Sequence, residues 1–246
     1  MSRIPVRLVL VLAIVGLVVG LGPRVPEALA RVDTFRATRH EFEGLRFLTG
    51  EAVLTAAGID QEANIWEDPE PWEERLEEHP LILDAHVGRR FPGTLVISLT
   101  ERTPVGLVPT PALEPVDREG AFLPLDPSRF PLDYPILRPQ PVAGEEEGEA
   151  SAVQRRELAA AAETMRQESD FWSQVSEIRP GPHGGFEVRW GHPEVLFRLK
   201  KPVELRRIRH GMAAVEDARS RRDGRLPLKV DLRFEDVVVL GWEVES

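Results

Sequence analysis

The chain begins with a long uncharged segment that restricts where the rest of the protein can fold. Leu8 to Pro23 reads LVLVLAIVGLVVGLGP, Arg3 and Arg7 precede it, and no acidic residue occurs before Glu27. A helix over this segment is roughly 24 Å long, and snorkelling by Arg7 closes the gap to a hydrocarbon core of ~30 Å. We therefore expect residues 1–30 to form a short cytoplasmic tail and a transmembrane anchor, with the bulk of the chain extracytoplasmic.

A cleaved signal peptide is the competing interpretation of the same segment. Signal peptides share the basic start and the apolar stretch, and the sequence from Ala28 to Ala30 resembles a cleavage site. The apolar stretch is long for a signal peptide, however, and Arg24 and Glu27 place charges just before the cut. We favour the uncleaved anchor. Under the alternative, the mature protein is a secreted periplasmic binding domain.

Composition and motifs argue against several functional classes. A net charge of -10 disfavours a general nucleic-acid binder, which needs a positive field. The chain has no cysteine, so thiolate nucleophiles, Cys-ligated zinc and disulfides are excluded. Its six histidines never have the i, i+4 spacing of a helical metal pair, and no HExxH, GxSxG or Walker motif occurs. We expect no enzyme activity, no catalytic residues, no metal and no cofactor.

Residues 31–103 have the pattern of a small α+β domain. Thr49 is suited to cap a short helix ending at Gly58, and a second helix has Trp72 and Leu76 four residues apart. Apolar and polar residues then alternate through LILDAHVGRR and TLVISLTE, which predicts two strands joined by a turn at Phe91–Gly93. The apolar face of the first strand is expected to hold Leu81, Leu83, Ala85 and Val87. With a strand before Thr49, the order is β-α-α-β-β.

Residues 104–246 predict a mixed α/β domain dominated by an antiparallel sheet. An acidic loop over 139–151 is expected to be disordered, and Ser151 with Gln154 predicts a capping box at the helix that follows. One apolar stripe is expected along that helix, formed by Leu158, Ala161, Ala162 and Met165. Strands are expected at Val175–Pro180 and Phe186–Trp190 and around Phe197. The last helix carries an arginine cluster from Arg206 to Arg222, which we interpret as its solvated face.

The chain finishes on KVDLRFEDVVVLGWEVES, which predicts one long terminal strand. Val230, Leu232, Phe234 and Val238 begin one apolar face with period two, interrupted only at Asp236. The opposite face is charged at its ends but apolar at its centre. The sequence alone is compatible with a strand buried inside a sheet or with an edge strand that pairs with a partner chain.

The motifs occur in an order that resembles the FtsQ/DivIB family of bacterial cell-division proteins. The segment from His79 to Gly106, HPLILDAHVGRRFPGTLVISLTERTPVG, resembles the POTRA segment of that family. PVDREGAF resembles its Val-Asp-x-x-Gly strand pair, and VDLRFEDVVVLGW resembles its final strand, including the Trp eight residues after the aromatic. The similarity extends over nearly the whole chain. It implies a membrane anchor, a POTRA domain and an FtsQ-type β domain.

The resemblance also implies a function and a set of site residues. It implies a non-enzymatic scaffold of the division septum, single-pass in the inner membrane, that links septal cell-wall synthesis to division. Its terminal strand is expected to bind FtsB-like and FtsL-like divisome proteins by strand addition. The partner-binding residues expected on this strand are Arg233, Phe234, Asp236, Val237, Leu240 and Trp242. A recruitment surface for other septal membrane proteins would fall at Asp84, Val87 and Arg89, although Val87 lies on the apolar face of its strand.

The anchor interpretation predicts a defined membrane topology. The full-length chain should stay in the membrane fraction after high-salt and alkaline washing, because an uncharged helix buries its side chains in the hydrocarbon core. Protease added to spheroplasts should remove everything after Arg24. Immunoblotting of the fractions measures both outcomes. A soluble mature form that begins at Arg31 would contradict the anchor and favour export.

Overall fold

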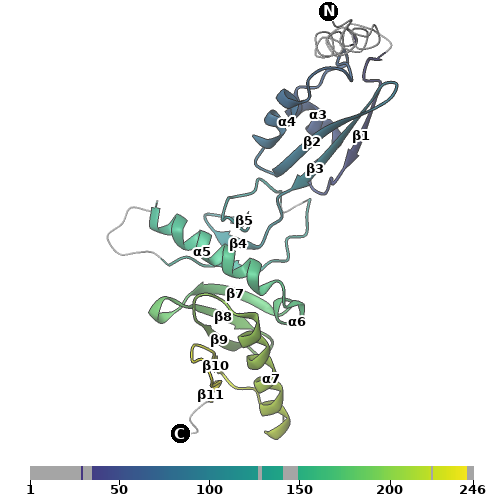
Figure 1. Cartoon of the computed structure of the whole chain (residues 1–246). Helices are drawn as coiled ribbons and strands as arrows, with labels where there is room; N and C mark the ends of the chain where they lie inside the picture. The colour runs from purple at the N-terminus through teal and green to yellow at the C-terminus, as the bar shows by residue number, and fades with distance from the viewer. Residues whose placement is uncertain (1–28, 30–34, 127–128, 141–148, 223, 243–246) are drawn as a thin grey trace, which may run out of the picture. The chain divides into compact units, whose positions relative to one another are not determined.

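The computed structural model describes residues 29, 35–126, 129–140, 149–222 and 224–242 (Figure 1). The chain divides into two compact units, unit 1 up to Arg102 and unit 2 from Thr103. The predicted anchor, apart from Leu29, and most of the acidic loop lie outside the described residues. Among the residues that are described, no helix is both long and apolar enough to span a bilayer.

Unit 1 has the predicted order β-α-α-β-β. Its three-stranded sheet has the order β1-β3-β2, with β1 parallel and β2 antiparallel to β3. The elements are β1 (Arg39–Glu43), α3 (Gly50–Ala57), α4 (Glu70–Glu77), β2 (Ile82–Arg90) and β3 (Thr94–Glu101). The expectation of a small α+β domain is therefore confirmed for its elements and their order.

Local signals set the helix boundaries in unit 1. The hydroxyl of Thr49 accepts a hydrogen bond from the amide of Ala52, and Gly58 closes α3 with a left-handed φ of 69°. The Arg75 guanidinium donates to the carbonyl of Ala57 at 2.8 Å, which ties α4 to the end of α3. Trp72 and Leu76 of α4 are buried against the same core. Both predicted caps of α3 are thus confirmed.

The predicted face of β2 is wrong at its first residues. Ile82 is buried and Leu83 is exposed, whereas the alternation from Leu81 placed Leu83 on the apolar face. The pairing with β3 shifts register between Ile82 and Asp84, which marks a β-bulge. A bulge adds one residue to one strand and exchanges the faces of its neighbours. From Ala85 onward the predicted alternation holds.

Unit 2 is built on one eight-stranded mixed sheet of order β11-β10-β9-β8-β7-β6-β4-β5. Three pairings, β4–β6, β6–β7 and β9–β10, are parallel, so the predicted antiparallel character applies to the other four. The strands are β4 (Gly106–Pro109), β5 (Leu113–Val116), β6 (Ile136–Leu137), β7 (Val175–Pro180), β8 (Phe186–Trp190), β9 (Val195–Leu199), β10 (Lys229–Asp231) and β11 (Val239–Gly241). The helices are α5 (Glu149–Met165), α6 (Ser169–Trp172) and α7 (Leu205–Arg221), with a short 3-10 turn η2 (Pro182–Gly184).

The two long helices and one face of the sheet form a single core. Leu158 and Met165 of α5 and Ile208 of α7 are fully buried in the same cluster as Phe197 of β9. The apolar stripe predicted for α5 is therefore confirmed. Its predicted capping box is not, because α5 begins at Glu149 and the Gln154 side chain accepts instead from the Gln140 amide at 2.8 Å.

The opposite face of the sheet carries paired charges. Glu187 of β8 is buried and accepts hydrogen bonds from Arg179 on β7 and Arg198 on β9. Burial alone raises the pKa of Glu187, but the two arginine hydrogen bonds outweigh it, so the pKa lies below its ordinary value. The sheet is consequently apolar toward its helices and ionic on its other side.

Helix α7 packs closely on the sheet at Gly211. A Cβ atom at this position would lie 2.9 Å from Leu232 Cδ1 and 3.0 Å from Phe197 Cε1, and both of those side chains are buried. Gly211 therefore sets the distance between α7 and strands β9 and β10, because any larger residue must push apart a packed core.

Gly211→Val is expected to lower the free energy of unfolding by about 1–3 kcal/mol, the cost of overpacking a core. The matched control is Ala213→Val on the exposed side of the same helix, where only helix propensity changes and the cost is below about 0.7 kcal/mol. Urea unfolding followed by circular dichroism measures both variants. Equal effects of the two changes would contradict the close packing at Gly211.

Candidate functional site

The terminal segment, Leu228–Trp242, folds as a pair of short strands. β10 and β11 pair antiparallel, with Val230 opposite Leu240, and the chain turns between them. The prediction of one continuous strand is therefore wrong. The segment is divided because its middle residues are held by side chains that bend the chain after β10.

The first of these is Asp231, which is only 4% exposed. Its carboxylate accepts a hydrogen bond from the backbone amide of Arg233 at 3.2 Å. It also accepts two hydrogen bonds from the guanidinium group of the same residue, at 2.9 and 2.7 Å. An aspartate that binds an amide two residues ahead favours a turn over an extended strand. The hydrogen bond from Arg233 lowers the pKa of Asp231, and burial opposes this only in part. The ion pair thus ends β10.

The second is Arg207 on α7, which is only 5% exposed. Its Nη2 donates to the carbonyl of Val237 at 2.7 Å, while its buried Nε has no hydrogen-bond partner among the residues described. Our sequence interpretation grouped Arg207 with the solvated arginine cluster, and for this residue that interpretation is wrong. Arg207 instead fixes the connection between β10 and β11 on the side facing the helix.

β11 is the last strand of the sheet. β10 is enclosed between β9 and β11, whereas the outer edge of β11 pairs with no other strand in the described part of the chain. Residues Val237 to Leu240 contain neither charge nor proline, the two features that normally protect an edge. The expected edge strand is therefore only three residues long, from Val239 to Gly241.

The terminal segment also exposes apolar side chains. Of the nine large apolar side chains that the described residues expose, four belong to this segment, with Phe234 at 53% and Val237 at 56%. The other two are Leu228 and Val239. Leu228 was not among the predicted residues; its position two residues before Val230, at the start of the last strand region, was the available signal.

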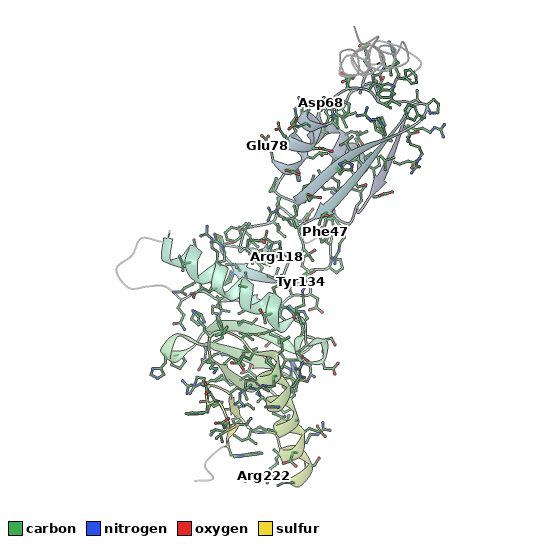
Figure 2. The ribbon with its side chains drawn as sticks, in the orientation of Figure 1. Phe47, Asp68, Glu78, Arg118, Tyr134 and Arg222 are labelled. Atoms are coloured by element: carbon green, nitrogen blue, oxygen red, sulfur yellow. The ribbon has the colours of Figure 1, made fainter. Side chains whose placement is uncertain are left out.

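The remaining predicted residues have different surroundings. Asp236 is exposed, and Leu240 is half-buried against the core. Trp242 is half-buried, with the Arg222 guanidinium carbon 4.1 Å from its ring centroid; Figure 2 labels Arg222 at the end of α7. Arg233 is partly buried and is used by the Asp231 ion pair. Only Phe234, Asp236 and Val237 of the predicted set are therefore exposed.

A hollow of about 450 Å³ adjoins Phe234. The β7–β8 connection contributes His183 to its wall, and Lys200 and Lys201 follow β9. Each lysine is already paired, Lys200 with Glu204 and Glu235 and Lys201 with Glu157. Because both lysines are paired with carboxylates, the hollow carries little net charge from them. Its main feature is the concave surface next to the exposed Phe234 ring.

The residues predicted for a recruitment surface in unit 1 do not gather in one place. Asp84 lies near the start of β2 and Arg89 near its end, and both are exposed. Val87 is buried between them, and its amide donates to the Glu73 carboxylate at 2.7 Å. Val87 thus lies on the buried face of β2, where the alternation placed it. Arg89 lies over the ring of Trp66, 5.3 Å from its centroid.

In the described ranges, no group of three or more His, Asp or Glu residues is arranged to hold a metal ion. Unit 2 presents an apolar sheet edge in a segment with exposed aromatic and aliphatic side chains, an arrangement suited to pairing with another extended chain.

Comparison with known proteins gives a consistent result. Residues 37–102 match the family model of the POTRA domain, FtsQ-type. The chain is 29% identical over 213 residues to the cell division protein FtsQ of Myxococcus fulvus, covering 80% of this chain and 75% of that protein. It is 29% identical over 225 residues to FtsQ of Rhodothermus marinus, covering 86% and 80%. FtsQ of Syntrophotalea carbinolica is 32% identical over 127 residues, covering 51% and 45%. The resemblance drawn from the sequence motifs is confirmed.

The ion pair between Asp231 and Arg233 predicts a pH-dependent contribution to stability. Because the folded pKa of Asp231 lies below its ordinary value of 3.8, the contribution is fully present above that pH and is lost as the pH falls through the folded pKa. Asp231→Asn should lower the unfolding free energy by about 1–3 kcal/mol near neutral pH. The difference from the wild-type protein should shrink below pH 3.8.

Urea unfolding at a series of pH values measures this difference. Asp236→Asn, at an exposed carboxylate in the same connection, is the control and should change the free energy of unfolding little at any pH. A difference for Asp231→Asn that stays constant through the acid range would show that its carboxylate does not stabilise the turn by charge.

Proposed function

We propose that the chain, which is similar to FtsQ cell-division proteins over most of its length, is a non-enzymatic scaffold of the division septum that binds a small partner along β11. The partner is an FtsB-like protein acting together with an FtsL-like one. It adds a strand to the sheet of unit 2, so that the sheet continues from one chain into the other.

The unpaired edge of β11 is the observation that supports this proposal most. An unpaired edge carries free amide and carbonyl groups and is a template for another extended chain. The same terminal segment exposes Phe234, Val237 and Val239. Backbone hydrogen bonds to β11 would be tolerant of partner sequence, and the exposed side chains would select the partner.

The bend before β11 favours binding because it holds the edge in place before the partner arrives. Arg207 fixes the carbonyl of Val237, and Leu232 is buried under Gly211 at the beginning of the same connection. Ordering a loop on binding costs free energy, and a connection that is already fixed avoids much of that cost. The hollow beside Phe234 provides room for one side chain of the added strand.

The membrane part of the proposal depends on the N-terminal sequence. Residues 1–30 provide the anchor, 31–103 the POTRA domain and 104–246 the β domain, with the N-terminus in the cytoplasm and the bulk outside it. Among the residues expected to recruit other septal membrane proteins, Asp84 and Arg89 are exposed and available. Val87 is buried and acts through packing.

Binding through β11 predicts that Phe234→Ala weakens the affinity for the partner and leaves the stability of the fold nearly unchanged. Truncating an interface aromatic costs about 2 kcal/mol, which is roughly a thirtyfold loss of affinity. The melting temperature should change little because the ring is 53% exposed. Affinity for an FtsB-like peptide is measured by isothermal titration calorimetry, and the melt by circular dichroism.

The matched control is Phe197→Ala, which removes the same ring from the core. Phe197 is fully buried, so this change should cost about 3–5 kcal/mol of folding free energy. Amide hydrogen exchange gives a second measurement: the amides of β11 should exchange more slowly when the peptide is bound. Unchanged affinity of Phe234→Ala together with unchanged exchange in β11 would contradict binding at this edge.

A further inference from the structure

One end of unit 1 gathers features that the binding of a partner at β11 does not use. Arg39 of β1 and Arg90 of β2 both lie opposite Thr94 of β3, so β1 and β3 begin where β2 ends. The amides of Thr38 and Arg39 donate to the carbonyl of Gly93 in the β2–β3 turn. We call this the proximal end, defined by Phe35–Arg39, Trp66 and Arg89–Thr94 (Figure 1).

Three aromatic rings meet at the proximal end. The ring of Trp66 lies 6.1 Å from that of Phe35 and 5.5 Å from that of Phe91, and the two phenylalanine rings are 6.4 Å apart, measured between centroids. Phe91 is 59% exposed, the largest exposed fraction of any large apolar side chain in the described ranges. A ring that is this exposed and that packs against two other rings presents an apolar surface for contact.

The charge around these rings is opposite in sign to that of the whole chain. Arg36, Arg39, Arg89 and Arg90 are exposed in the proximal end, while the net charge of the chain is -10. Of the acidic side chains in this region, Glu41 pairs with Arg90, and Glu67 and the exposed Asp68 follow Trp66 in the chain. Four exposed arginines thus accompany an exposed aromatic side chain.

The chain reaches the proximal end directly from the predicted anchor. The apolar segment ends at Pro23 and the continuous described part of unit 1 begins at Phe35, so the eleven residues 24–34 connect them. At no more than ~3.5 Å per residue, this connection keeps the proximal end within about 40 Å of the bilayer. Tethering at this distance makes even a weak contact with the bilayer intramolecular.

From these observations we propose that the proximal end contacts the bilayer surface, with Phe91 entering the headgroup region and the arginines facing anionic lipid phosphates. Exposed phenylalanine side chains enter the boundary between headgroups and acyl chains, and each basic residue near an anionic surface adds to the attraction. This inference rests on the anchor that the proposed function includes. It adds a lipid-binding surface to unit 1 and thereby an orientation of that unit relative to the membrane.

The absence of cysteine allows single labels in the full-length chain. Thr38→Cys places a fluorescent label in the proximal end, and Thr100→Cys places one at the other end of β3; both threonines are exposed. Each protein is reconstituted into vesicles of phosphatidylglycerol and phosphatidylethanolamine that carry brominated acyl chains. We expect at least threefold stronger quenching by the lipid at position 38 than at position 100.

A second pair of changes tests the aromatic contact. Phe91→Ser, added to Thr38→Cys, should reduce the quenching to the level seen at position 100. Leu83→Ser is the matched control, because Leu83 is also exposed but lies at the other end of β2, and it should leave the quenching unchanged. Replacing phosphatidylglycerol with phosphatidylcholine should weaken the quenching at position 38, since the arginines lose their anionic counterpart.

The possible failures are distinguishable. A chain that does not float with the vesicles contradicts the anchor, and with it the proposed topology. A chain that floats but is quenched equally weakly at both positions overturns the lipid contact and leaves the anchor intact. A label at position 38 that is shielded from aqueous iodide but not quenched by lipid would mean that a protein segment covers Phe91, which also overturns the proposal.

Discussion

The hairpin of β10 and β11 at the end of the large sheet depends on one buried guanidinium. Arg207 of α7 donates to the carbonyl of Val237, and this contact holds the connection between β10 and β11 against the helix. A buried arginine is costly to desolvate, so a hydrogen bond to a carbonyl beside it contributes more than it would in water. Together with the Asp231–Arg233 turn, it converts an extended tail into a hairpin with a defined outer edge.

The periodic parts of the fold could be predicted from the sequence, and the bend could not. Alternation located the three strands from Val175 to Leu199, and the spacing of apolar residues located α5 and α7, because burial of one face imposes a fixed period. The turn after Asp231 depends on which carboxylate becomes buried, and the β2 bulge depends on the register with β3. Neither follows from a local pattern.

The same limit applies to the site. Exposed Phe234 was among the predicted residues because aromatic side chains anchor interfaces, and Val237 because of its position on the same strand, yet Arg207 was assigned to solvent from its position among arginines. On α7 it immediately precedes the buried Ile208, at the border of the apolar stripe. Whether a long side chain at such a border turns inward depends on the partner it meets, here a carbonyl thirty residues further along the chain.

The shortness of β11 has consequences for how a partner is bound. A strand of three residues offers few backbone hydrogen bonds, and each contributes only about 1 kcal/mol net in water. Most of the affinity for an added strand must then come from side chains, and the terminal segment exposes four large apolar ones. A short edge also limits pairing between copies of the chain, and the exposed Glu235 and Asp236 add charge beside it. An edge of this kind is selective because pairing alone is too weak to hold a partner that lacks matching side chains.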